Sequence, residues 1–175
     1  TGTGNTGFMI YHSNYIKFDG SCSLEYQGNN SAGWGYQSGM MAYYTRQIEI
    51  IMDITLTSSA AGWLGGALVF NGCTSVGIYG DLTKSGAQFT PHGVAAINGT
   101  WIYQYGDITN FANGLSMGVN HYGNSTRCDG VLAGCTISDC VDGVRLWRNS
   151  IIHQSGNSFS NNSSNNINST DGFVV

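Results

Sequence analysis

Residues 134–146 have the sequence GCTISDCVDGVRL, and this stretch decides the fold that we expect the chain to adopt. The Asp-Gly pair at 142–143 is followed by an alternation of apolar and polar residues, Val144, Arg145 and Leu146. An Asp-Gly pair tolerates a positive φ angle and turns the chain, and strict alternation is typical of a strand with one buried face. The stretch therefore predicts a corner and then a strand, with Val144 and Leu146 buried and Arg145 facing outward.

The same signature occurs twice more, as NGLSM at residues 113–117 and as DGFVV at residues 171–175. The glycines of the three copies stand at positions 114, 143 and 172, so the two intervals between them are equal. A fixed period of this length is typical of a solenoid, in which the short strands of successive coils stack on one another. The period predicts two inward-facing columns of side chains, Leu115–Val144–Phe173 and Met117–Leu146–Val175.

With this repeat in place, residues 134–146 resemble a coil of the bacteriophage tailspikes. Residues 94–175 as a whole resemble the right-handed β-helix of the pectate-lyase-like superfamily. The resemblance implies an all-β fold with a right-handed parallel β-helix (solenoid) in the C-terminal half, and it implies a homotrimer. It does not specify an activity, because the repeat encodes stacking.

Residues 1–93 do not show the repeat clearly, and we expect a β-rich region there with a Gly- and aromatic-rich loop. Residues 47–57 alternate as a half-buried strand does, but the phase breaks at Ile50–Ile51, which suggests a bulge. The Gly-rich stretch 26–44, with Trp34 and Tyr36 among its aromatic residues, is either a connector that packs on its neighbours or a loop that binds sugar or another subunit.

The composition excludes several classes of protein. Only 9% of the 175 residues are charged and the formal net charge is −4, whereas 26 residues are glycine and 17 are asparagine. Exposed helical faces need Leu, Glu and Lys, in which the chain is poor, so an all-α fold is excluded. Six scattered basic residues form no stripe for nucleic acid, and no apolar run of about 18 residues could span a membrane. Residues 1–7 have neither an initiator Met nor the regions of a signal peptide, so we expect a fragment or a processed product.

The five cysteines, at positions 22, 73, 128, 135 and 140, include no CxxC pair and no zinc-ligand spacing. We expect buried, reduced thiols that act as small apolar side chains, which suits assembly in a reducing cytoplasm. The repeat places Cys140 where Phe111 stands one coil earlier, so Cys140 should point into the core. The four histidines also lack metal-ligand spacing, and we expect neither a metal nor a cofactor.

Two carboxylates on the best-defined coil, Asp139 and Asp142, are the candidates for catalysis, because glycosidases use a pair of carboxyl groups. The alternative is structural: Asp139 aligns with Asn110 and Asp142 with Asn113, and Asp or Asn at such places is what a turn favours.

Arg145, Trp147 and Arg148 are the candidates for glycan binding. An indole stacks on the face of a sugar ring, and a guanidinium group donates hydrogen bonds to hydroxyl or carboxylate groups. The alternative is that Trp147 covers the core at a corner or lies between subunits.

The expected function is that of a viral tailspike or tail-fibre fragment that binds bacterial surface polysaccharide for host attachment. Its partners would be that polysaccharide, two further copies of the chain and other virion proteins, and it would reside in the virion after assembly in the host cytoplasm. Two alternatives stay open. One is a depolymerase, a hydrolase or lyase on the same scaffold, and the other is a non-catalytic shaft or head-binding domain.

Overall fold

The computed structural model describes residues 6–20, 23–26, 38–56, 66–85, 92–119 and 126–175. These residues form β-strands and no helix, which confirms the expected all-β class. The strands belong to three sheets, here named A, B and C, and every pair of neighbouring strands is parallel.

Each sheet takes every third strand of the chain. Sheet A has the order β1 (Thr6–Tyr11), β4 (Ser38–Tyr43), β7 (Gly66–Asn71), β10 (His92–Ile97), β13 (Asn113–Met117), β16 (Asp142–Leu146) and β19 (Asn165–Ser169). Sheet B has the order β2 (Tyr15–Phe18), β5 (Gln47–Ile50), β8 (Ser75–Ile78), β11 (Trp101–Gln104), β14 (Asp129–Ala133), β17 (Ile151–Ser155) and β20 (Phe173–Val174). Sheet C consists of β3 (Ser23–Tyr26), β6 (Asp53–Leu56), β9 (Leu82–Lys84), β12 (Ile108–Thr109), β15 (Thr136–Ser138) and β18 (Ser158–Ser160).

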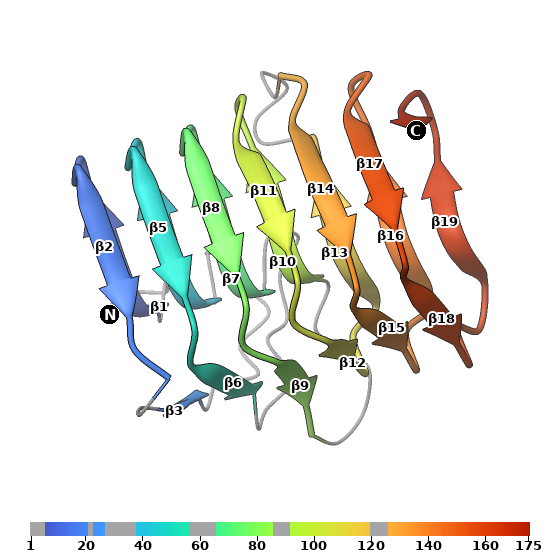
Figure 1. The fold of residues 1–175 in the computed structure, drawn as a ribbon, viewed down its shortest axis with the longest axis horizontal. Coiled ribbons are helices and arrows are strands. Elements are labelled where there is room, and N and C mark those ends of the chain that lie inside the picture. Colours follow the sequence, from blue (N-terminus) through green and yellow to red (C-terminus); the bar gives the residue numbers. More distant parts are fainter. Residues whose placement is uncertain (1–5, 21–22, 27–37, 57–65, 86–91, 120–125) are drawn as a thin grey trace, which may run out of the picture.

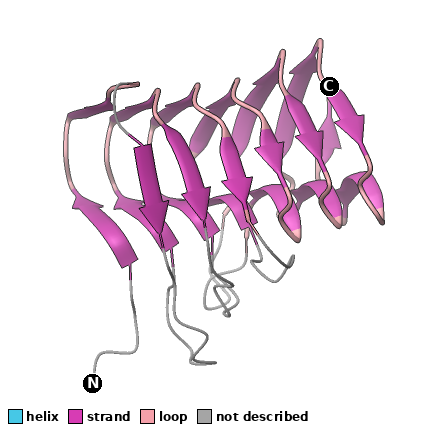
Figure 2. Cartoon of the chain, turned by 90° about the horizontal axis from the view of Figure 1, so that it is seen from below, coloured by secondary structure: helices cyan, strands magenta, loops and turns pink. Residues whose placement is uncertain are grey.

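Three successive strands therefore form one repeat, with one strand in each sheet, and successive repeats lie side by side along the molecule (Figures 1 and 2). The first and last strands of each sheet lie at opposite ends of the stack. Because parallel strands cannot be joined by a hairpin, the chain returns to the same sheet only after passing through the other two.

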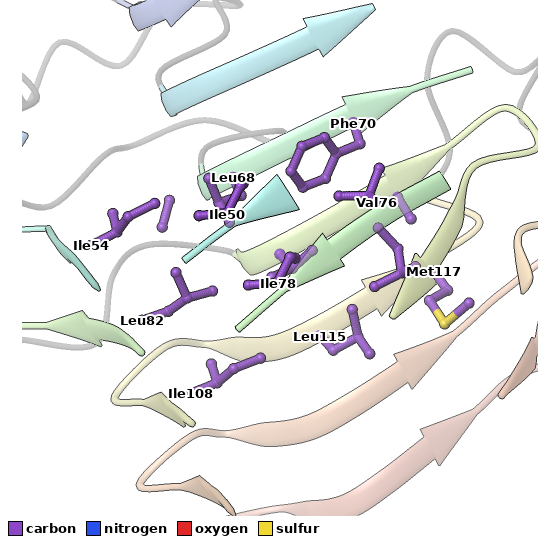
Figure 3. Close-up of a cluster of buried hydrophobic side chains, with 14 of the residues drawn as sticks. Ile50, Ile54, Leu68, Phe70, Val76, Ile78, Leu82, Ile108, Leu115 and Met117 are labelled. Carbon is purple, nitrogen blue, oxygen red and sulfur yellow. The ribbon is translucent and has the colours of Figure 1, made fainter. Parts of the chain in front are cut away.

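The core lies between the three sheets and consists of columns of apolar side chains. In sheet A, fully buried side chains follow one another at paired positions from Met40 through Leu68, Val94 and Leu115 to Val144. Columns from all three sheets meet in one cluster (Figure 3), which includes Ile50, Ile54, Leu68, Phe70, Ile78, Leu82, Ile108, Leu115 and Met117. Burial of one such side chain contributes about 1.5–3 kcal/mol, so the columns drive the stacking of the repeats.

The period of the three glycines predicts that the strand at Gly114 pairs with the strand at Gly143, and that the latter pairs with a strand at Gly172. The first of these two pairings is observed. Leu115 pairs with Val144 and Met117 pairs with Leu146, and all four side chains are fully buried. The two expected columns are therefore confirmed between β13 and β16.

The second step of the prediction is wrong. Phe173 is not in sheet A but pairs with Ile151 of sheet B, and the backbone N–H of Val175 donates to the carbonyl of Ile152 in the same sheet. Ile167 and Ser169 of β19 take the expected places in the two columns.

The cause of this shift is the length of one connection. Residues 118–128 join β13 to β14, whereas residues 147–150 suffice to join β16 to β17. The later repeat is correspondingly shorter, so Gly172, one full period after Gly143, falls just before β20 instead of inside β19. The Asp-Gly pair at 142–143 lies inside β16 and the pair at 171–172 precedes β20, and neither glycine has a positive φ angle, so the turn predicted at Asp142–Gly143 is wrong.

The strand pairing also runs without interruption across residues 93 and 94, because β10 spans them and pairs with β7 and with β13. Residues before 94, expected as a separate β-rich region, thus contribute strands to the same three sheets. The connections between the strands of residues 1–93 differ in length, so the sequence shows no fixed period in this part of the chain. The loop expected over residues 26–44 lies partly outside the described residues, and its described end is β4.

The bulge expected at Ile50–Ile51 is wrong. Strand β5 ends at Ile50 in sheet B and β6 begins at Asp53 in sheet C, so the chain turns a corner between two sheets there. Burial keeps its alternation through this corner, because Ile50 and Met52 are buried and Ile51 is exposed, so there is no shift of phase.

Four of the five cysteines, Cys73, Cys128, Cys135 and Cys140, are free and buried, as expected, while Cys22 lies outside the described residues. Cys140 takes the place of Phe111 in the core: an added Cβ on Gly114 would lie 3.5 Å from its sulfur, and one on Gly93 would lie 3.1 Å from the Phe111 ring. The position predicted for Cys140 is therefore confirmed.

The corner between sheets B and C carries a row of carboxylates, Asp53, Asp81 and Asp107, here named the aspartate row. The backbone N–H groups of Asp81 and Asp107 donate to the carboxylates of Asp53 and Asp81, each at 2.9 Å, and that of Thr136 donates to Asp107 at 2.6 Å. Each carboxylate thus satisfies a backbone donor of the next repeat, which the turn would otherwise leave unpaired.

The same corner has no room for side chains at Gly80 and Gly106. An added Cβ on Gly106 would overlap the carbonyl oxygen of Gly80, and one on Gly80 would overlap that of Met52. Neither glycine has a positive φ angle, so close packing of successive backbones is the reason for glycine at these two positions.

Candidate functional site

Three of the five residues predicted as site residues come together on the outer face of sheet A. The guanidinium carbon of Arg145 lies 4.6 Å from the centre of the Trp147 ring, and Arg145 Nη1 lies 3.8 Å from Asp142 Oδ2. Trp147 is half-buried and packs against an apolar cluster of Met41, Val69, Ala95, Ile97 and Val119. A substitution of Trp147 would therefore alter packing as well as any binding surface.

Asp142 is tied to the neighbouring strand. Its two carboxylate oxygens accept hydrogen bonds from the side-chain amides of Asn165 and Asn168, each at 2.9 Å, and the residue is 4% exposed. These bonds join β16 to β19 and occupy both oxygens of the carboxylate.

The other two predicted residues lie at opposite ends of β16. Asp139 occupies the corner before β16 with a φ angle of 55° and accepts a hydrogen bond from Asn161 Nδ2 at 3.2 Å. Arg148 follows β16 with a φ angle of 57° and is exposed. The two candidate carboxylates therefore differ in setting, one at a turn and one buried among amide groups.

A different surface, the outer face of sheet B, carries a groove. It has a volume of about 250 Å³ and crosses β5, β8 and β11. Its lining consists of Gln47, Ile48, Glu49, Ser75, Gly77, Tyr79, Tyr103 and Tyr105. We call it the tyrosine groove.

Glycine and stacked rings shape this groove. An added Cβ on Gly77 would lie 2.9 Å from Cε2 of Tyr79, so the Tyr79 ring lies over a strand position that has no side chain. The rings of Tyr79 and Tyr105 stack in parallel with their centres 5.0 Å apart, and the ring of Trp101 lies 6.1 Å from that of Tyr103. The groove therefore presents aromatic rings, and the Tyr79 ring covers the strand position that has no side chain.

Glu49 is the carboxylate of the lining and is held in place by two donors. The Tyr15 hydroxyl donates to Glu49 Oε2 at 3.2 Å, and Gln47 Nε2 donates to Glu49 Oε1 at 3.0 Å. Desolvation, together with the hydrogen bond and charge of Glu49, raises the pKa of Tyr15. Desolvation, then the neighbouring Tyr105 and the charge of Glu49, raises the pKa of Tyr79. Both hydroxyl groups therefore remain protonated at neutral pH.

None of the groove residues was predicted from the sequence, although the chain carries a signal for them. The pentapeptide YGDLT at residues 79–83 recurs as YGDIT at residues 105–109, one repeat later. Each copy supplies one groove tyrosine, one corner glycine and one member of the aspartate row. The recurrence of an exposed tyrosine in successive repeats predicts a ring stack on one face.

No protein-family model matches the chain, and neither a curated protein nor a solved structure matches it. Within the described ranges, no group of three or more His, Cys, Asp or Glu residues is arranged to hold a metal ion. Across the same ranges, no helix has the length and apolar character needed to cross a membrane.

The chemistry that the tyrosine groove offers is recognition of a polar ring-shaped ligand. Tyrosine faces stack on apolar ring surfaces, while the tyrosine hydroxyls, Gln47 and Glu49 can exchange hydrogen bonds with hydroxyl groups. Glycosidic hydrolysis needs two carboxyl groups about 5–9.5 Å apart, and the lining supplies one. The lining therefore offers groups for ring stacking and for hydrogen bonding.

Proposed function

We propose that this chain is a segment of a bacteriophage tailspike or tail fibre that binds bacterial surface polysaccharide through the tyrosine groove. In this proposal the three parallel sheets form a right-handed parallel β-helix, and the virion carries the protein after assembly in the host cytoplasm. The observation that carries the proposal is the groove itself, in which three tyrosines and Glu49, on or directly after three neighbouring strands, line one surface and the Tyr79 ring lies over Gly77. The sequence resemblance of residues 134–146 supports the assignment to a tailspike.

The proposal predicts that Tyr103→Ala lowers the affinity for a bound polysaccharide at least about tenfold, because it removes a stacking face. The measurement is binding of the purified protein to a panel of lipopolysaccharides and capsular polysaccharides. A second variant, Gly77→Ala, is expected to weaken binding by displacing the Tyr79 ring.

The matched control is Tyr11→Ala, which removes a tyrosine that is stacked on Tyr43 of sheet A, outside the groove. It should bind as the unmodified protein does. Equal loss in Tyr11→Ala and Tyr103→Ala, or no binding to any member of the panel, would contradict the proposal.

Assembly into a homotrimer is part of the same proposal and makes a separate prediction. The sequence resemblance of residues 134–146 to a tailspike coil implies a homotrimer. Sedimentation equilibrium at micromolar concentration should give three times 18.7 kDa. A monomer mass would remove the trimer from the proposal and leave the groove unaffected.

The alternative of a depolymerase is distinguished by a reducing-sugar assay on the polysaccharide that binds. Release of reducing ends that Glu49→Gln abolishes would assign turnover to the groove. Release that persists in this variant and is lost in Asp139→Asn would favour the other carboxylate candidates.

A further inference from the structure

The charges around the tyrosine groove point to the class of sugar that it takes. The lining residues include one carboxylate, Glu49, and no cationic side chain. Beyond the groove, one glycine separates Tyr79 from Asp81 and Tyr105 from Asp107, so each tyrosine and aspartate are at most about 7 Å of extended chain apart. That separation is shorter than the Debye length of about 8–10 Å, so the aspartate row acts on a ligand in the groove.

The cations on this face are fewer and lie outside the groove. Lys17 of β2 lies opposite Glu49 of β5 in the strand register. Gly77 lies in β8, on the other side of β5. Arg46 precedes Gln47 at the start of β5, and Arg127 is bound to Asp129 at 2.7 Å. Arg127 is already bound to a carboxylate, so the cations left to compare are Lys17 and Arg46. The carboxylates of Glu49 and the aspartate row outnumber them.

The rings reinforce this preference. A cation is attracted to the face of a tyrosine ring within about 6 Å of its centre, and the groove presents such faces beside a carboxylate that two donors hold in place. A protonated amine on a sugar can contact the Glu49 carboxylate and a tyrosine face together. A carboxylate or sulfate on a sugar would meet the like charge of Glu49 within the groove, because Lys17 and Arg46 lie outside its lining.

We infer that the tyrosine groove is selective for glycans whose sugars carry a free, protonated amino group, and that Glu49 is the residue that recognises this group. The inference rests on the proposed function and specifies its ligand. It differs from the expectation for Arg145, Trp147 and Arg148, which would suit acidic glycans.

The test compares three probes at pH 5.5 by isothermal titration calorimetry: hexamers of glucosamine, of N-acetylglucosamine and of galacturonic acid. The glucosamine hexamer should bind at least about tenfold more tightly than the acetylated hexamer, because acetylation removes the charge. The galacturonic acid hexamer should bind most weakly. Glu49→Gln should abolish the preference for glucosamine, so that the glucosamine and N-acetylglucosamine hexamers bind this variant with affinities within about twofold of each other.

Asp129→Asn is the matched control, because it removes one negative charge from the same sheet outside the groove. It should keep the preference. An equal loss in Asp129→Asn and Glu49→Gln would overturn the role of Glu49, since the effect would then come from net charge.

The outcomes separate the inference from the proposed function. If Tyr103→Ala weakens all hexamers equally and the unmodified protein does not prefer glucosamine, amine recognition is overturned and glycan binding stands. If the galacturonic acid hexamer binds most tightly, the inference is again overturned. If no hexamer and no polysaccharide of the panel binds, both amine recognition and the proposed function are overturned.

Discussion

Replacing Gly106 by alanine is expected to lower the free energy of unfolding by about 3 kcal/mol or more. The added methyl group would overlap the carbonyl oxygen of Gly80, and backbone cannot move aside as a flexible side chain can. The N–H groups of Gly80 and Gly106 also donate to the carbonyls of Ile50 and Ile78, so a shift at this corner would strain the strand pairs beside it. Urea unfolding followed by circular dichroism measures the effect.

Gly134→Ala provides the control for this experiment. Gly134 also lies at a corner between sheets B and C, but no atom lies within 4 Å of the added Cβ and the φ angle is 64°. The expected cost is about 1 kcal/mol, from the left-handed backbone alone. If the two variants lose the same stability, close packing of backbones at Gly106 is not what requires glycine there.

Raising the pH from 8 to 10.5 is expected to destabilise the fold through its buried thiols. Burial, followed by the charge of Asp107, raises the pKa of Cys135 from 9.0 to about 12, and burial also raises the pKa values of Cys73, Cys128 and Cys140. Between pH 9 and 12 the unfolded chain releases the Cys135 proton while the folded chain keeps it. The free energy of unfolding should therefore fall by about 1.4 kcal/mol per pH unit for this thiol, or about 2 kcal/mol at pH 10.5.

Below pH 9 both states keep the proton, so this contribution to stability is fully present there. Chemical unfolding at pH 8.0, 9.5 and 10.5 tests the prediction, with Cys135→Ala as the comparison. The slope of stability against pH above 9 should be shallower in Cys135→Ala. Equal slopes in the two proteins would show that Cys135 ionises as readily in the folded chain as in the unfolded one.

The sequence predicts the strand pairing where the same signature recurs in two strands that pair, as in β13 and β16. Alternation in residues 144–146 and 115–117 is enough to place Val144, Leu146, Leu115 and Met117 in columns, because the period of a strand is two and its register is set by the buried face. The error at Phe173 arises because a connection that is seven residues shorter leaves no mark in the strands themselves.

The groove is harder to predict from sequence because its residues come from three repeats. Glu49, Gly77 and Tyr103 occupy paired positions on neighbouring strands, yet a full repeat of the chain separates each of them from the next. Their proximity follows only once the strand register is known. By contrast, Arg145 lies in β16 and Trp147 follows it two positions later, just after the strand ends, so a local pattern was sufficient to predict that they lie together.

The unequal connections between sheets A and B have a consequence for the stacking of the repeats. The connection after β13 has eleven residues and leads to β14, and the connection after β16 has four residues and leads to β17. Despite this difference in length, β13 pairs with β16 and β14 pairs with β17. Closing the longer loop costs only about 0.9 kcal/mol more in chain entropy. The stack therefore accommodates connections of unequal length between the same two sheets, so a change in the length of one repeat need not change the pairing of the next, while Val119 and Cys128 remain buried.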